Sequence, residues 1–119
     1  MRAMLIPVGG YPREIDVEGY DDIENILGGK IVSLGHLFMD EPRLYAIAGA
    51  EKSCTANRLI NGQLVYGNAL AIGFDPFEGE LCGLTNAEVK WIKCELGTPA
   101  SVMSGKLEAL RLRKEARSQ

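Results

Sequence analysis

The residues best suited to chemistry in this chain lie in one segment near its middle. Asn57, Arg58, Tyr66 and Asn68 place two amides, a guanidinium and a phenol among apolar neighbours, around an Asn61-Gly62 pair. A guanidinium is a planar fork of donors that suits a phosphate or a carboxylate, and a tyrosine adds a stacking face with a hydroxyl group. These four residues are therefore the candidate ligand- or partner-binding site.

The same four residues also have a structural interpretation, which we favour because Asn is first of all a turn residue. Asn57 would cap a turn, Arg58 would be solvated or pair with an acid, Tyr66 would pack, and Asn68 would close the hairpin. The two interpretations differ at Arg58. As an exposed binding residue it would contribute little to folding, whereas a structural Arg58, paired with an acid such as Glu51 or Asp75, would stabilise the domain.

No other residue combination predicts a catalytic or metal centre. The single histidine, His36, lies in an apolar segment without a meaningful Cys-His or Ser-His spacing, so we expect a structural histidine. The three cysteines, Cys54, Cys82 and Cys94, have irregular spacing and form no Cys-x-x-Cys pair, which predicts reduced thiols. We therefore expect no metal site and no cofactor, and the sequence identifies no catalytic residue.

Charge divides the chain into an acidic body and a basic tail. Residues 1–105 carry 8 basic and 14 acidic side chains, and residues 106–119 carry five basic and two acidic ones. The acids between residues 14 and 24 could chelate a hard cation, but their alternation with aliphatic residues favours a solvated sheet edge. The tail could bind nucleic acid weakly or an acidic partner, although a disordered terminus is the commoner outcome.

The pattern of apolar residues predicts an α+β domain over residues 1–100, followed by a basic tail, 101–119, that is helical, frayed or disordered. The expected core is a mainly antiparallel sheet of four to five strands with two packed helices. The strands are expected at residues 4–8, 14–18, 30–38, 43–48 and 64–74, and the helices at 21–28 and 85–96. The Asn61-Gly62 pair predicts a tight hairpin turn, residues 49–53 and 75–80 are expected as loops, and residues 54–59 as a helical turn or irregular lead-in.

Several local signals support these elements. Asp21 or Asp22 is expected to cap the first helix, Gly28-Gly29 to end it, and Thr85-Asn86-Ala87-Glu88 to open the second as a capping box. Gly35 predicts a bulge. The expected core comprises Leu5, Ile26, Ile31, Leu34, Ile47, Leu70, Ile72, Val89, Trp91 and Ile92. No apolar run approaches the ~20 residues of a membrane span, and Pro7 interrupts the first one, so we expect a strand there rather than a signal peptide, and a cytoplasmic location.

The order of certain features carries a resemblance. A helix ends at Gly28-Gly29 before a strand, an acidic turn and an extended segment follow, and a loop leads to Asn57-Arg58. Then come Leu64-Val65-Tyr66-Gly67-Asn68, an apolar strand, and a Leu84-Thr85-x-x-Glu88 helix. In these respects residues 2–99 resemble a family of small proteins of unknown function that is common in bacteriophages and mobile elements of gut bacteria. The chain departs from that family at residues 49–52, where the family often has an Asn-Glu-x-Gly turn.

The family has no agreed activity, so the resemblance implies a setting and not a mechanism. The first hypothesis is a non-catalytic accessory protein that binds a host protein or a small ligand, for which a nucleotide-like molecule is one option. The alternative is a small nucleotide-directed hydrolase or transferase, with Arg58 on a phosphate and Asp75 or Glu78 as base. A second alternative is weak nucleic-acid binding through the tail. The sequence does not determine the oligomeric state.

Overall fold

The computed structural model describes residues 1–38 and 41–97 and, in the C-terminal segment, residues 107, 110–112 and 114; at residues 36, 38 and 41 it describes the backbone alone. The elements along the chain are β1 (Arg2–Ile6), β2 (Arg13–Asp16), α1 (Tyr20–Leu27), β3 (Ile31–Phe38), β4 (Glu41–Ile47), α2 (Ala50–Ser53), β5 (Ala56–Ile60), β6 (Gln63–Tyr66), β7 (Ala69–Asp75), β8 (Glu80–Cys82) and α3 (Asn86–Leu96).

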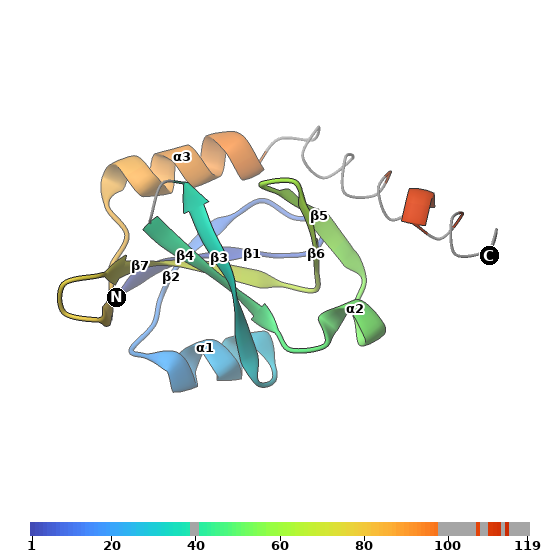
Figure 1. Ribbon diagram of the computed structural model, residues 1–119. Helices are drawn as coiled ribbons and strands as arrows, with labels where there is room; N and C mark the ends of the chain where they lie inside the picture. Colours follow the sequence, from blue (N-terminus) through green and yellow to red (C-terminus); the bar gives the residue numbers. More distant parts are fainter. Residues whose placement is uncertain (39–40, 98–106, 108–109, 113, 115–119) are drawn as a thin grey trace.

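The main sheet is antiparallel and has β7 at its centre. Its strand order is β2-β1-β7-β4-β3, β8 pairs with the far end of β7, and β5 and β6 form a separate two-stranded hairpin (Figure 1). The predicted α+β class with an antiparallel sheet is confirmed. The expected number of four to five strands is too low: the sheet of the described residues has six, because the chain after the turn at residues 75–80 returns to pair with β7 as β8. The acidic strand β2 lies at one edge, as its charge pattern predicts, because charged side chains discourage pairing with other chains.

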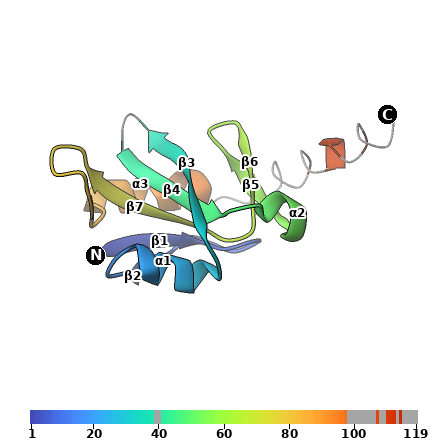
Figure 2. The same ribbon diagram turned by 60° about the horizontal axis from the view of Figure 1, so that its bottom comes forward.

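Both faces of the sheet are covered. Helix α3 and the β5–β6 hairpin lie on one side and α1 on the other, as Figures 1 and 2 show together. Alternate residues of β7 therefore enter two cores: Ala69 and Ala71 pack toward α3, whereas Leu70 and Ile72 pack toward α1. Burial on both faces explains why this strand is an uninterrupted apolar run rather than an alternating one.

The Asn61-Gly62 hairpin turn is confirmed. It joins β5 to β6 with Ile60 opposite Gln63, and both turn residues are left-handed, with φ of 52° and 77°. That geometry matches the right-handed twist of the flanking strands. The Asn61 side-chain amide also donates to the Leu37 carbonyl of β3, at 2.6 Å, so the turn fixes the hairpin to the main sheet.

Three expectations around this hairpin are wrong. Residues 54–59 are not a helical lead-in but contain most of β5, and the expected loop at 49–53 contains the short helix α2. The single strand expected at 64–74 is two strands, β6 and β7. The extended conformation is interrupted at Gly67, whose φ of 71° belongs to the left-handed region.

Both predicted helices are confirmed within a residue or so of their expected ends. Helix α1 ends at left-handed Gly28, and α3 begins with the Thr85–Glu88 capping box. The expected cap of α1 is wrong, because Gly19 is its N-cap residue. Asp22, in the first turn, instead reaches back and accepts a hydrogen bond from the Glu18 backbone N–H at 2.8 Å. The predicted Gly35 bulge is present as a register shift between Ser33 and His36.

The core prediction holds except at one residue. Ile26 is 39% exposed, because α1 has only eight residues and buries Ile23 and Leu27, and a neighbouring position is turned by about 100° around the helix axis. The other predicted residues are buried or pack partly buried against the two cores: Leu5, Leu70, Ile72, Val89 and Ile92 in the first group, and Ile31, Leu34, Ile47 and Trp91 in the second.

Two further observations concern the helices and the C-terminal tail. Among the described residues, no helix has the length and apolar character needed to cross a bilayer. In the tail, the described residues 107, 110–112 and 114 are helical and exposed. The prediction of a frayed or disordered tail otherwise lies outside the described residues.

Candidate functional site

The structure places the four candidate residues in different environments. Arg58 and Asn57 lie inside the protein, with 0% and 1% of their surface exposed. Tyr66 is half-buried, and Asn68 is exposed. The expectation of an exposed Arg58 is therefore wrong, and a phosphate or carboxylate from solvent cannot reach its guanidinium without opening the fold.

The Arg58 guanidinium joins three segments of the chain. It donates from Nη2 to the carbonyl oxygens of Pro7 at 2.8 Å and Gly10 at 2.6 Å, and from Nη1 to the carbonyl oxygen of Leu96. Its Nε donates to Asn57 Oδ1 at 2.7 Å. Four of the five N–H donors of a guanidinium are thus used inside the protein, and they tie β5 to the β1–β2 loop (residues 7–12) and to the end of α3.

Asn57 completes this network from the other side. Its Nδ2 donates to the carbonyl oxygens of Ile6, at the end of β1, and Gly67, before β7, each at 2.9 Å. Adjacent residues of a regular strand point to opposite faces, yet Asn57 and Arg58 are both buried. The pairing of β5 with β6 shifts register between Ala56 and Arg58, and such a bulge redirects a side chain.

The partners of Arg58 are neutral acceptors, an amide and three carbonyl groups, and not the acids Glu51 or Asp75 of the structural interpretation. Burial lowers the pKa of the Arg58 guanidinium from its ordinary value, since desolvation disfavours the charged form. The C-terminal end of α3 offsets part of that cost. Leu96 is its last residue, and the carbonyl groups at a helix end carry partial negative charge.

Arg58 and Asn68 both hold the β1–β2 loop. Besides the two carbonyl groups bound by Arg58, the loop offers the Val8 backbone N–H, which donates to Asn68 Oδ1 at 3.0 Å. The side chains that this loop presents to solvent are Val8, 37% exposed, and Tyr11, 71% exposed. The polar residues singled out in the sequence therefore support a surface formed by other residues.

The acids proposed as a catalytic base lie elsewhere. Asp75 and Glu78 belong to the turn between β7 and β8, where Asp75 Oδ1 accepts hydrogen bonds from the backbone N–H groups of Phe77 and Glu78. Because β1 and β7 run antiparallel, with Ile6 opposite Ala69 and Ala3 opposite Ile72, this turn and the β1–β2 loop lie at opposite ends of the two strands. Arg58 and these carboxylates do not form one site.

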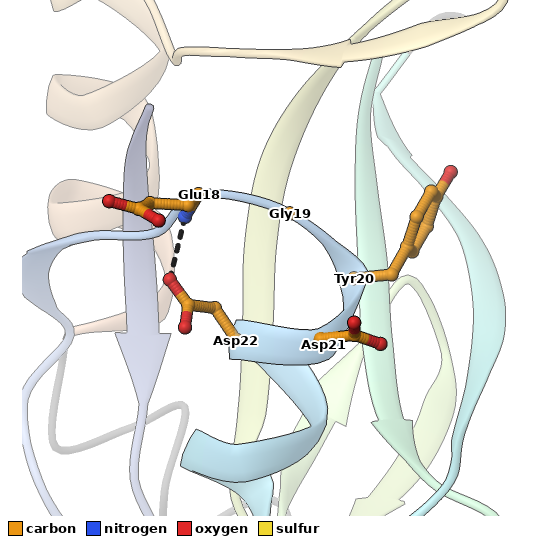
Figure 3. Close-up of a pocket in the computed structure, with 5 residues that line it drawn as sticks. All are labelled: Glu18, Gly19, Tyr20, Asp21 and Asp22. Carbon is orange, nitrogen blue, oxygen red and sulfur yellow. Dashed lines mark hydrogen bonds between the residues drawn. The ribbon is translucent and has the colours of Figure 1, made fainter.

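The acidic segment near α1 lines an open hollow of about 420 Å³, formed by Glu18, Gly19, Tyr20, Asp21 and Asp22. Figure 3 shows the Glu18 and Tyr20 side chains pointing away from each other, while Asp22 turns back to the Glu18 backbone. The carboxylates therefore do not converge on one point. Within the described part of the chain, no three His, Cys, Asp or Glu side chains gather where they could hold a metal ion.

One cluster has no signal in the sequence. The Arg43 guanidinium carbon lies 3.5 Å from the centroid of the Phe74 ring, and the buried Arg43 Nε has no hydrogen-bond partner. Beside it, Tyr45 meets Tyr20 edge to face, with centroids 6.0 Å apart. Burial raises the pKa of the Tyr45 hydroxyl group, and the Tyr20 hydroxyl group adds to this effect. These residues come from β4, β7 and α1, so only the fold brings them together.

The cysteines and His36 are the remaining residues singled out in the sequence. Of the three cysteines, Cys54 and Cys82 are half-buried and Cys94 is exposed. The side chain of His36 lies outside the described residues. Comparisons with known protein families, curated proteins and solved structures gave no match, so the resemblance to a phage family stays a prediction.

Proposed function

We propose that this protein is a non-catalytic accessory protein of a phage or mobile element that acts in the cytoplasm by binding a host protein or a small ligand such as a nucleotide. The observation that supports this proposal is the β1–β2 loop, which buried polar side chains hold from within while Tyr11 stands exposed on it. The resemblance of residues 2–99 supplies the setting.

The loop has the properties of a prepared binding surface. Arg58 binds the carbonyl groups of Pro7 and Gly10, the Gly10 N–H donates to the Pro7 carbonyl oxygen at 3.2 Å, and Asn68 holds Val8. A segment that is already ordered loses less conformational entropy when it binds. Tyrosine is enriched among the residues that dominate binding energy because it offers a large amphipathic surface.

In this proposal the contact residues are Val8 and Tyr11, and Asn57, Arg58 and Asn68 are positioning residues. A hydrolase that places Arg58 on a phosphate would need that side chain at the surface, so we do not propose it. Nucleic-acid binding through the tail stays a prediction, tested by a steep salt dependence that vanishes when residues 106–119 are deleted.

The test compares the wild-type protein with Tyr11→Ala in affinity capture from host lysate, followed by mass spectrometry of bound proteins and small molecules. Val32→Ala is the control, because Val32 is also an exposed apolar residue, at 41%, but lies on β3. We expect a partner that the wild type and the control retain and that Tyr11→Ala loses, with an unchanged melting temperature. Equal capture by all three proteins would exclude the loop as the binding surface. Turnover in a broad substrate screen would refute the non-catalytic part.

A further inference from the structure

The most exposed large apolar side chain of the described residues is Phe77, at the tip of the β7–β8 hairpin. It is 96% exposed, so almost none of its ring contacts the protein that carries it. The hairpin projects from one end of the sheet in both views, far from β5 and β6 (Figures 1 and 2). A single exposed apolar residue is common and needs no function. A role for Phe77 therefore depends on the order and the charge of the hairpin that carries it.

The tip is ordered by its own hydrogen bonds. Asp75 Oδ1 accepts from the Phe77 N–H at 2.9 Å and from the Glu78 N–H at 3.3 Å, and the Gly79 N–H donates to the Asp75 carbonyl oxygen at 2.8 Å. Gly79 has a φ of 69°, which favours glycine. The backbone that carries Phe77 is therefore fixed before any partner arrives.

The base of the hairpin is also held. Phe74 pairs with Leu81 across the strands, and the Arg43 guanidinium lies over the Phe74 ring. A rigid protruding aromatic side chain on a fixed base is the form of the anchors that dominate protein–protein binding energy.

The charges of the tip indicate the chemistry of the partner. Three carboxylates, those of Asp75, Glu78 and Glu80, lie within six residues, and no basic residue lies among them. Asp75 and Glu80 stand directly opposite each other in the ladder, an arrangement of like charges that destabilises a hairpin. The Asp75 carboxylate is needed by the turn, because the Phe77 and Glu78 N–H groups donate to it. A hairpin that served folding alone would, however, gain from a lysine in place of Glu80.

We propose that the β7–β8 hairpin docks on a partner protein, with the Phe77 ring in an apolar pocket and the three carboxylates facing a rim of Lys and Arg side chains. The ring supplies affinity through burial, and the acids supply the association rate and the choice of partner. This surface is distinct from the β1–β2 loop, so the proposal goes beyond the proposed function and can hold or fail independently of it.

The experiment places the photo-crosslinking amino acid p-benzoylphenylalanine at position 77 of the full chain, in cells of the organism that encodes the protein. A second protein with the same group at position 11 is the control for the opposite end of the molecule. The protein that cross-links to position 77 is identified by mass spectrometry, purified, and titrated with the wild type, Phe77→Ala, Tyr11→Ala and the double variant Glu78→Gln/Glu80→Gln.

We expect Phe77→Ala to weaken binding at least about tenfold, since burial of a phenylalanine ring is worth that much or more, while the melting temperature stays unchanged. Tyr11→Ala should bind that partner as the wild type does, which separates this proposal from the previous one. The double variant should associate more slowly and lose most of the salt dependence of the association rate.

Four results would overturn the proposal: no cross-linked protein at position 77, cross-linking there only to a second copy of the chain, an affinity of Phe77→Ala within about twofold of the wild type, or an unchanged association rate after removal of the two charges. A lipid membrane is the other possible binding partner of Phe77, and vesicles of zwitterionic lipid test it. Binding to these vesicles through Phe77 would also count against a protein partner.

Discussion

Replacement of Arg58 by alanine tests whether this residue is structural. The change removes four charge-assisted hydrogen bonds and leaves buried acceptors on Pro7, Gly10, Leu96 and Asn57. Hydrogen bonds to a charged group contribute about 1.5–3 kcal/mol each, or roughly 6–12 kcal/mol for four. Desolvation of the buried cation opposes this by several kcal/mol, so we expect a net loss of about 3–5 kcal/mol in the free energy of unfolding.

That loss is a large fraction of the ~5–15 kcal/mol that stabilises a typical domain. At about 4 °C per kcal/mol for a domain of this size, the melting temperature of Arg58→Ala should fall by roughly 12–20 °C. Thermal unfolding followed by circular dichroism measures this change. Arg13→Ala, which removes an exposed arginine of β2, is the control and should stay within about 0.5 kcal/mol of the wild type.

Arg58→Lys sharpens the experiment. It keeps the positive charge but not the planar fork that reaches Pro7, Gly10 and Asn57 together, so it should also destabilise the protein, by less than alanine does. A melting temperature for Arg58→Ala within about 2 °C of the wild type would refute the structural role, and a binding role for an exposed Arg58 would then regain support.

Three further changes test other parts of the structure. The raised pKa of Tyr45 keeps its hydroxyl group protonated in the folded state, while an unfolded tyrosine ionises near pH 10.0. The free energy of unfolding should therefore be constant below that pH and fall above it, and it should fall less steeply for Tyr45→Phe in denaturant titrations at several pH values. Parallel pH dependence in the two proteins would contradict the assignment. Thr85→Ala removes the capping box of α3 and should cost about 1 kcal/mol, seen as a drop of roughly 4 °C in melting temperature; no drop would show that the cap contributes nothing. Gly62→Ala forces a side chain into a φ of 77° and should lower the free energy of unfolding by about 1–2 kcal/mol, by the same measurement. Gly29→Ala is the control and should lower it less, because a methyl group there would meet Ile47 at an ordinary 3.5 Å. Equal losses in the two variants would contradict the strain at Gly62.

The sequence predicted the elements that local signals specify. Gly28, Thr85 and the Asn61-Gly62 pair each act within a few residues, and each did what its type predicts. Strand β5 (Ala56–Ile60) was missed because its signal is weak and its pairing with β6 contains a bulge. That same bulge hides the burial of Arg58, since strict alternation with Asn57 would leave one of the two outside.

The sequence grouped Asn57, Arg58 and Asn68 correctly in space but did not show what they contact. Asn57, Arg58 and Asn68 do lie together around one loop, yet the residues they expose, Val8 and Tyr11, come from another part of the sequence and carry no motif. The carbonyl oxygens that accept hydrogen bonds from Arg58 are backbone groups, which every residue has. A pattern of side-chain types cannot show them, and only the fold gives their positions.

Two departures from ordinary folding rules point in opposite directions. Arg58 buries a charge, but an amide and three carbonyl groups accept its donors, so the fold itself accounts for it. The exposed ring of Phe77 and the like charge of Glu80 opposite Asp75 have no compensating contact among the described residues. Departures that the fold does not compensate are expected at functional positions. The search for function should therefore begin at the β7–β8 hairpin and the β1–β2 loop, and not at the guanidinium that first suggests chemistry.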